Sequence, residues 1–399
     1  MTRVAPTDRP NRRPIVLAAG GTGGHMFPAE ALARTLLARG ERVVLVTDRR
    51  GQAFDEKLPE VVTHRIRAAT PSRGTLGRVR AAAELFAGFW QARGLLRREA
   101  PAAVVGFGSY ASVPTVIAAG RLGIPVALHE QNAVLGRANR LLAGRARVIA
   151  TSFPTQHGLR EADCSKAITT GMPVRPAIAA VAGSPYRPPR PAGPVELLVT
   201  GGSQGAHVFA GLIPAALAAL PEELRRRLRV SQQCRPEDLE AVRAAYAGTG
   251  IGHDLATFFT DVPDRLVRAH LVIARAGAST VAELAAVGRP AILVPYPFAM
   301  DDHQSANAGA LADADGAWLQ PQATLTPATL ARMVQCLLEA PDTLARAASA
   351  AWAFGRGDAA GHLADVVQDL TGREPPVGPQ EHPAPDPSPV HLSHREAAE

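Results

Sequence analysis

A strand that breaks into a glycine-rich turn just before a helix occurs twice in this chain of 399 residues, and this repeat constrains the fold most strongly. The first copy runs from 15–19 into 20–25, and the second from 195–200 into 201–206. Apolar β-branched runs alternate with helical patterns after each copy, which is typical of βαβ units in a parallel sheet. The sequence therefore predicts an α/β fold with two Rossmann-like parallel-sheet domains facing a cleft.

The alternation predicts the strands of each half. In the first half we expect strands at 15–19, 43–47, 103–105, 126–128 and 148–150. In the second half we expect strands at 195–200, 229–232, 256–260, 271–274 and 291–295. Between the halves the pattern gives way at 173–194 to proline, glycine and arginine, which predicts an interdomain linker. The proline-rich end of the chain lacks apolar periodicity, which predicts disorder.

Composition limits the classes of partner. The chain has 43 Lys and Arg against 36 Asp and Glu, a net charge of +7 that suits anionic ligands or an anionic membrane surface. Nucleic acid is not expected, because no basic run is interleaved with aromatic residues. Three widely spaced cysteines form neither a disulfide framework nor a zinc spacing, which favours a reducing cytosol. The first 13 residues lack the apolar core of a signal peptide, and 197–221 is too interrupted to span a membrane, so any membrane contact is expected to be peripheral.

The first glycine turn suits an anionic ligand with chemistry beside it. Its glycines let backbone N–H groups approach a ligand, and Pro28 suits the first turn of the helix that follows, whose start favours an anion. His25 is the best general-base candidate; a histidine that only caps or binds a phosphate is the alternative. The dinucleotide fingerprint fails at Met26, where its third glycine belongs, but Asp48 keeps an NAD-dependent oxidoreductase open. A tight turn without a ligand is also open.

Five motifs occur in order along the chain: GGTGGH at 20–25, HEQN at 129–132, TGMPVR at 170–175, GGSQGA at 201–206 and AGASTVAE at 276–283. Over about residues 14–365 this set closely resembles the MurG family of bacterial N-acetylglucosaminyltransferases, in glycosyltransferase family 28. The resemblance implies a GT-B fold and inverting transfer of N-acetylglucosamine from its UDP donor to undecaprenyl-pyrophosphoryl-N-acetylmuramyl-pentapeptide. It also implies a peripheral place on the cytoplasmic face of the bacterial inner membrane, with other cell-wall synthesis proteins as candidate partners.

With this resemblance we expect the chain to divide into six parts. They are a disordered N-terminus at 1–13, an N-terminal acceptor and membrane domain at 14–176, a linker at 177–194, a C-terminal UDP-sugar-binding domain at 195–352, a helix at 353–371 returning to the N-terminal domain, and a disordered Pro-rich tail at 372–399.

The departing diphosphate of such a transfer needs charge-assisted hydrogen bonds, and the helix start near Ser203, Arg175 and Arg275 can supply them. The resemblance implies that the donor also contacts Asn132, Ser279, Thr280, Glu283 and Gln304, with Glu283 accepting from the ribose hydroxyls. In the first loop, Thr22, Gly23 and Gly24 are expected to line the acceptor diphosphate or the donor sugar. Residues 280–283 also match a capping box, and both roles can coexist.

His129 is open between a ligand contact and a structural role. No metal or other cofactor is expected, because the D-x-D match at 313–315 lies at a helix end rather than after a core strand.

A basic segment with aromatic residues predicts a membrane-facing surface in the first half. Six arginines and a single acid, Glu84, lie between Arg73 and Arg98. Such a segment beside exposed aromatics docks on anionic lipid, although the same face can instead pack into the domain core. The expected membrane contacts, of which the first four share one helical face by spacing, are Leu85, Phe86, Phe89, Trp90, Arg78 and Arg80.

Two more functions remain open beside the transferase: a sugar-nucleotide epimerase of the same two-domain architecture, and a non-catalytic nucleotide-binding partner of a wall-synthesis assembly. The chain also departs from the usual family pattern at several positions. These positions are Ser109, Met172, His207, Thr260 and His303.

Overall fold

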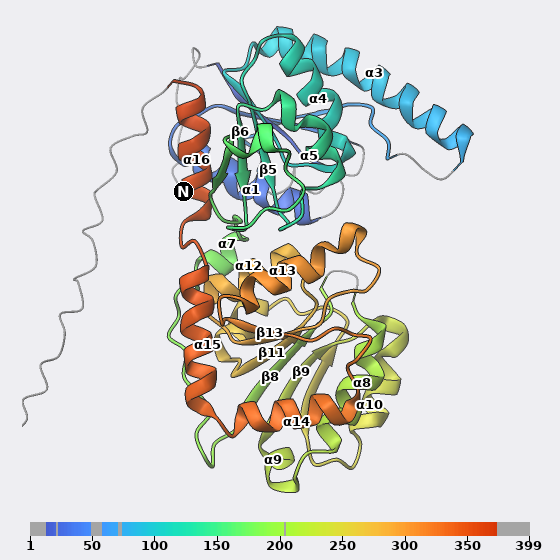
Figure 1. The fold of residues 1–399 in the computed structure, drawn as a ribbon, viewed down its shortest axis with the longest axis vertical. Coiled ribbons are helices and arrows are strands. Elements are labelled where there is room, and N and C mark those ends of the chain that lie inside the picture. The colour runs from blue at the N-terminus through green and yellow to red at the C-terminus, as the bar shows by residue number, and fades with distance from the viewer. Residues whose placement is uncertain (1–12, 21–22, 49–57, 71–73, 203–204, 373–399) are drawn as a thin grey trace, which may run out of the picture.

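The computed structural model describes residues 13–20, 23–48, 58–70, 74–202 and 205–372 as two α/β domains stacked along the long axis of the molecule (Figure 1). The termini at 1–12 and 373–399, which the sequence predicts to be disordered, lie outside these ranges. Thr22 and Ser203, two predicted ligand contacts, also lie outside them.

In the N-terminal domain, seven described strands form one parallel sheet in the order β3-β2-β1-β4-β5-β6-β7. The strands are β1 (Ile15–Ala18), β2 (Val43–Thr47), β3 (Val62–Arg65), β4 (Ala103–Gly106), β5 (Val126–Glu130), β6 (Val148–Thr151) and β7 (Ala167–Thr169). The helices are α1 (Gly23–Ala38), α3 (Thr75–Glu99), α4 (Ser109–Arg121), α5 (Arg137–Leu142), η1 (Ala143–Arg145) and α6 (Glu161–Cys164), with α7 (Pro176–Ala179) after them.

In the C-terminal domain, six described strands form a second parallel sheet in the order β10-β9-β8-β11-β12-β13. The strands are β8 (Val195–Thr200), β9 (Leu228–Gln233), β10 (Gly252–Ala256), β11 (Leu271–Ala274), β12 (Ala291–Leu293) and β13 (Ala317–Leu319). The helices are α8 (His207–Ala218), α9 (Glu222–Arg227), η2 (Pro236–Asp238), α10 (Leu239–Tyr246), α11 (Val262–Arg268), α12 (Ala278–Val287), η3 (Met300–Asp302), α13 (His303–Ala312), α14 (Pro327–Leu338), α15 (Pro341–Phe354) and α16 (Ala359–Leu370).

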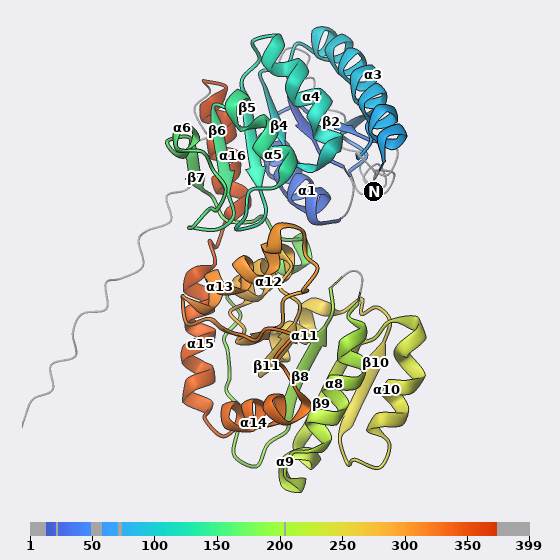
Figure 2. The same cartoon turned by 45° about the vertical axis from the view of Figure 1, so that its right-hand side comes forward.

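Helices cover both faces of each sheet (Figure 2). In the N-terminal domain, apolar residues of α1 and α16 pack on one face of the sheet and those of α3, α4 and α5 pack on the other. Because both faces are covered, the central strands are apolar throughout rather than alternating. This arrangement, with two such sheets in tandem, is the GT-B fold that the sequence predicts.

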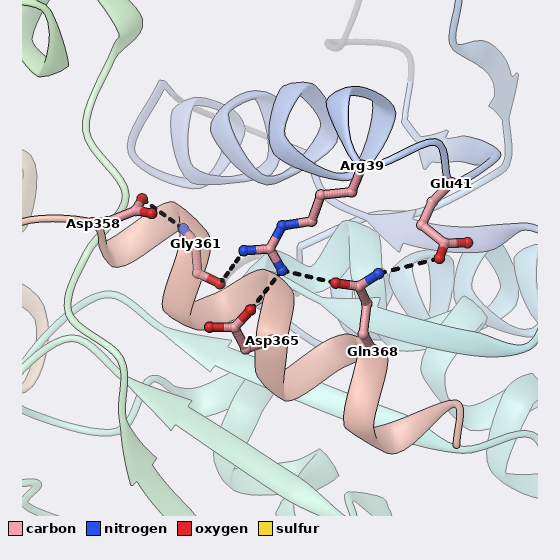
Figure 3. Close-up of polar contacts among 6 residues, drawn as sticks. All are labelled: Arg39, Glu41, Asp358, Gly361, Asp365 and Gln368. Carbon is pink, nitrogen blue, oxygen red and sulfur yellow. Dashed lines mark hydrogen bonds and ion pairs between the residues drawn. The ribbon is translucent and has the colours of Figure 1, made fainter. Parts of the chain in front are cut away.

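The last of the described helices, α16, belongs to the N-terminal domain although it follows the C-terminal one in sequence. Its Leu363 and Val367 are fully buried against the face of the N-terminal sheet that α1 also covers, over β4, β5 and β6. At the end of α1, the Arg39 guanidinium donates to Asp365 Oδ1 at 2.6 Å and to Gln368 Oε1 at 2.7 Å (Figure 3). The chain therefore crosses between the domains twice, once before β8 and once before α16 (Figure 1).

Two local predictions are wrong. The strand predicted at 256–260 lies at Gly252–Ala256 instead, because Phe258 is exposed in a loop and Phe259 packs under Arg265, whose guanidinium carbon is 3.9 Å from the ring centroid.

Helix α1 begins at Gly23, so Pro28 lies inside the helix rather than in its first turn. A proline ring crowds the carbonyl four residues earlier, which here belongs to a glycine, Gly24.

Helix α3 lies along the outside of the N-terminal domain, in contact with α4 (Figure 1). A glycine is needed where it crosses the segment after β3, since a Cβ at Gly88 would lie 1.9 Å from Arg67 O. The Arg67 backbone N–H also donates to Gln91 Oε1 at 2.8 Å. These contacts fix which face of α3 is turned to the domain and which is left outside.

Candidate active site

His25 lies in the first turn of α1, where its ring is held by the chain after β4. Its Nδ1 is 2.8 Å from Phe107 O and 3.1 Å from Gln131 Oε1. A carbonyl oxygen can only accept a hydrogen bond, so Nδ1 carries the proton of the neutral ring. The other ring nitrogen, Nε2, then keeps a lone pair and can accept a proton from a reacting hydroxyl.

His129, on β5, has a structural rather than a ligand-facing position. It is fully buried, and its ring packs 5.5 Å from the ring of Phe107. Burial lowers the pKa of His129 to about 4; the backbone of Gly171 opposes this shift, and His25 adds to it. The buried His129 ring is therefore neutral at neutral pH.

We expect acid to destabilise the fold through His129. In the unfolded chain, His129 takes up a proton below its ordinary pKa of 6.5. In the folded protein the buried ring takes up that proton only near pH 4. The free energy of unfolding should therefore fall by about 2 kcal/mol from this group alone between about pH 7 and pH 5. Urea denaturation at both pH values measures the loss, and His129→Asn should have a shallower pH dependence. An equal pH dependence in both proteins would contradict the assignment.

The loop after β5 is tied to the C-terminal domain. The Glu130 carboxylate accepts from the backbone N–H groups of Asn132 and Gly136, at 3.0 and 2.9 Å. Asn307, fully buried on α13, accepts from Ala133 N at 2.8 Å and donates to Asn132 Oδ1 at 3.2 Å. The predicted sugar contact Asn132 is therefore held at the junction of the two domains.

Arg175 and Glu283 also meet across the junction. The guanidinium donates to both carboxylate oxygens, at 2.8 and 3.0 Å. Burial raises the pKa of Glu283, and the hydrogen bonds from Arg175 oppose the shift. Helix α12 begins at Ala278 after Gly277 without a side-chain cap, so the capping-box alternative for 280–283 is wrong. Glu283 is paired with Arg175 instead.

Two other predicted donor residues are Arg275, which directly follows β11, and Gln304, in the first turn of α13. Arg275 is buried and donates to Val294 O, Pro295 O and Gln322 Oε1 at 2.7–3.1 Å, so protein oxygens already engage its guanidinium. Burial lowers its pKa. Gln304 Oε1 accepts from Tyr296 N at 2.9 Å and holds the loop after β12.

The second glycine turn and the start of α12 supply backbone donors at the same edge of the sheet. A Cβ at Gly201 would lie 2.3 Å from Ala206 N, so only glycine lets the turn before α8 fold back this closely. Ser279 and Thr280 lie half-buried in the first turn of α12. In the other domain, Gly23 and Gly24 form the first two residues of α1. Three helix starts thus face the side where open α/β sheets bind ligands.

The predicted membrane residues divide between two environments. Phe86 is 65% exposed and Trp90 55% exposed, and their rings make an edge contact at 6.3 Å. Leu85 and Phe89 are half-buried, and Phe89 packs against the core of the N-terminal domain. The two arginines at the start of the helix, Arg78 and Arg80, are exposed.

Two polar residues of the site were missed in the sequence. Gln131 bridges His25 and His129, and Asn307 joins the domains. Strand alternation could have identified Gln131, because it lies two residues after His129 and so points to the same side. Asn307 gives no such signal, since a single amide in an apolar helix has many possible roles.

Metal-binding clusters and membrane-spanning helices are both absent from the residues that the structure describes. No three His, Cys, Asp or Glu residues in them come together as a metal site. No helix in those ranges combines the length and apolar composition that crossing a bilayer requires.

Comparisons with known proteins agree on the family. The N-terminal domain model of glycosyltransferase family 28 matches residues 15–151, and the C-terminal domain model of the same family matches 196–363. A Rhodospirillum centenum protein named UDP-N-acetylglucosamine--N-acetylmuramyl-(pentapeptide) pyrophosphoryl-undecaprenol N-acetylglucosamine transferase is 59% identical, over 90% of this chain and 95% of its own.

Solved structures give the fold. A crystal structure of Acinetobacter baumannii MurG aligns with a TM-score of 0.73 at 30% identity, over 89% of this chain and 99% of that one. A putative UDP-N-acetylglucosamine 2-epimerase from Listeria monocytogenes aligns at 0.63, over 92% and 98% of the two chains, but at 15% identity this likeness is one of fold alone. The sequence and structure together show that the chain belongs to the MurG family of glycosyltransferase family 28.

Proposed function

We propose that the chain transfers N-acetylglucosamine from UDP-N-acetylglucosamine to undecaprenyl-pyrophosphoryl-N-acetylmuramyl-pentapeptide. The acceptor hydroxyl attacks the anomeric carbon from the face opposite UDP, so the new glycosidic bond forms as the bond to UDP breaks, with inversion. The hydroxyl proton passes to a base, and UDP leaves as a diphosphate. The relative that carries this name, 59% identical over 90% of the chain, is the observation on which the proposal rests.

The base in this proposal is His25. Its Nδ1 proton is engaged by Phe107 O, which leaves Nε2 free to take the proton of the sugar hydroxyl. The start of α1 around Gly23 and Gly24 lies beside it and suits the acceptor diphosphate. Thr22, in the same loop, is proposed from the resemblance alone.

The donor in this proposal occupies the C-terminal domain. The turn before α8, with Ser203, and the start of α12, with Ser279 and Thr280, supply donors for the diphosphate. Glu283 accepts from the ribose hydroxyls and Arg175 adds positive charge beside the departing diphosphate.

Three more residues support the donor site. Asn132, in the loop after β5, and Gln304, in the first turn of α13, border the sugar in this proposal. Because protein oxygens engage Arg275, its part in the proposal is to hold the loop after β12 and to place positive charge behind the diphosphate.

A membrane surface at the cytoplasmic face of the inner membrane completes the proposal. The acceptor carries a lipid chain, so the enzyme must work at a bilayer. Helix α3 offers exposed Phe86 and Trp90 with exposed Arg78 and Arg80, the combination that favours an anionic interface. The same surface could also contact other cell-wall synthesis proteins.

Replacing Phe86 and Trp90 together by serine should weaken binding to anionic vesicles at least about tenfold, because two large apolar side chains no longer enter the interface. Vesicle co-sedimentation measures the loss, and UDP-N-acetylglucosamine affinity should stay unchanged. Phe258→Ser, at a side chain 68% exposed in the C-terminal domain, is the matched control and should bind vesicles normally. Unchanged vesicle binding by the double variant would rule out this surface.

The proposed reaction is tested by following labelled N-acetylglucosamine from its UDP donor into a lipid-linked muramyl-pentapeptide. We expect transfer with and without a chelator, because protein groups alone are proposed to stabilise the diphosphate. Absence of transfer would overturn the function, and loss of transfer on chelation would overturn the metal-independent mechanism. Turnover of the donor without acceptor would instead indicate an epimerase.

A further inference from the structure

A single amide group lies between His25 and His129 in the N-terminal domain. Gln131, 3% exposed, directly follows β5. Its Oε1 lies 3.1 Å from His25 Nδ1, and its Nε2 lies 3.0 Å from Phe107 O and 3.1 Å from His129 Nδ1. The side chain therefore contacts the proposed base and the buried histidine at the same time.

The orientation of this amide is fixed by its neighbours. His25 Nδ1 carries a proton because Phe107 O accepts from it, so the atom of Gln131 facing it must be the acceptor, Oε1. The two amide N–H groups then face Phe107 O, His129 Nδ1 and, at 3.3 Å, His129 O. Rotating the amide by half a turn would place N–H against N–H and oxygen against oxygen. Each contact thus excludes the alternative orientation.

The same orientation favours one form of His129. Its Nδ1 accepts from the amide, so the proton of the neutral ring is on Nε2. A protonated His129 would bring an N–H group against the amide N–H group and favour the rotated amide. Full burial keeps this ring neutral.

On the basis of the proposed function, we propose that Gln131 is a positioning residue for the transfer reaction. It holds the His25 ring with Nε2 unprotonated for the attacking hydroxyl. When His25 takes that proton, Oε1 of Gln131 and Phe107 O both accept from Nδ1–H of the imidazolium. His129 fixes which end of the amide faces the base.

Two carboxylates and a helix start lie around this network. On β5, the Glu130 carboxylate accepts from Asn139 Nδ2 at 2.8 Å and from backbone N–H groups of the following loop. Asp48, after β2, lies beside Gly20 at the start of the glycine turn. The start of α1 adds a positive helix end next to His25. A charge introduced at Gln131 would therefore act on His25 and His129 first.

Two variants with opposite effects test the role. Gln131→Met removes both hydrogen-bonding groups, so kcat should fall about tenfold or more, with KM for UDP-N-acetylglucosamine nearly unchanged. The acidic limb of its kcat profile should move to lower pH, because the imidazolium loses an acceptor. Gln131→Glu places a carboxylate there and should move the limb to higher pH. Limbs that stay in place, or that move in the same direction in both variants, would overturn the proposal.

The matched control is Gln232→Met. Gln232, 1% exposed on β9, also makes two buried hydrogen bonds, from its Nε2 to Phe209 O at 3.3 Å and from Tyr246 to its Oε1 at 2.7 Å. Losing these bonds should lower stability and leave the acidic limb in place. A shifted limb in this variant would mean that any buried amide loss perturbs the profile, and the proposal would fail.

A spectroscopic test does not depend on activity or on variants of Gln131. In wild-type protein labelled with ¹⁵N-histidine, His25 should carry its proton on Nδ1 and His129 on Nε2 at neutral pH, with the signals assigned by His25→Asn and His129→Asn. The opposite tautomer at either residue would overturn the network. Absence of N-acetylglucosamine transfer by the wild type would overturn only the proposed function, because the tautomers are read separately.

Discussion

His25→Asn is expected to lower kcat for N-acetylglucosamine transfer by about 10²- to 10⁴-fold, the range for loss of a general base. Asparagine can still donate to Phe107 O, the partner of His25 Nδ1, but it offers no basic lone pair to the attacking hydroxyl. The affinity for UDP should stay near the wild-type value, because the proposed donor site lies in the other domain. Steady-state transfer kinetics and calorimetric titration with UDP give the two quantities.

A second histidine provides the control for this prediction. His253 Nδ1 also faces a backbone carbonyl, Ile251 O at 3.1 Å, but the residue lies on the edge strand β10 of the C-terminal domain. His253→Asn should leave the transfer rate unchanged. If His25→Asn retains the wild-type rate, His25 only caps the helix or binds the acceptor phosphate.

Arg289→Met is expected to lower the free energy of unfolding by about 3–5 kcal/mol. Arg289 is fully buried, and its guanidinium donates only to backbone carbonyls, at 2.7–3.1 Å. These acceptors are in the linker at Ser184, at the end of α11, and in the turn after α12. Methionine would fill the space but leave several buried carbonyls without donors.

Chemical denaturation followed by tryptophan fluorescence measures this loss. Arg289→Lys should be intermediate, because an ammonium keeps the charge but cannot reach all of these carbonyls at once. Arg268→Met, at an exposed position on α11, should change stability by no more than about 0.5 kcal/mol. An effect of Arg289→Met as small as that of the control would show that these hydrogen bonds contribute little.

The two sheets could be predicted from the sequence because their central strands are buried on both faces. Such strands are continuous apolar runs, as at β1, β4 and β11. Edge strands were missed or displaced, since they are short and polar and pair on one side only. β3 has exposed residues at both ends, and β10 begins with glycine, histidine and aspartate.

The residues of the site could be identified from the sequence more readily than their contacts. Its glycine turns, His25, Arg175 and Glu283 lie in recognisable motifs. The pairing of Arg175 with Glu283 joins residues 108 positions apart, and no local pattern encodes a contact between domains. Gln131 belongs to the HEQN motif at 129–132, but its role depends on the carbonyl of Phe107, which lies in the loop after β4.

The position of α16 has a consequence for how the protein is made. The ribosome completes the seven described strands of the N-terminal sheet first, yet α16, which lies over β4, β5 and β6 of that sheet, is the last of the described helices to be translated. Until Leu363 and Val367 leave the exit tunnel, the apolar residues that α16 covers on this face stay exposed. The N-terminal domain, which begins synthesis first, therefore cannot complete its packing until the whole C-terminal domain has been translated.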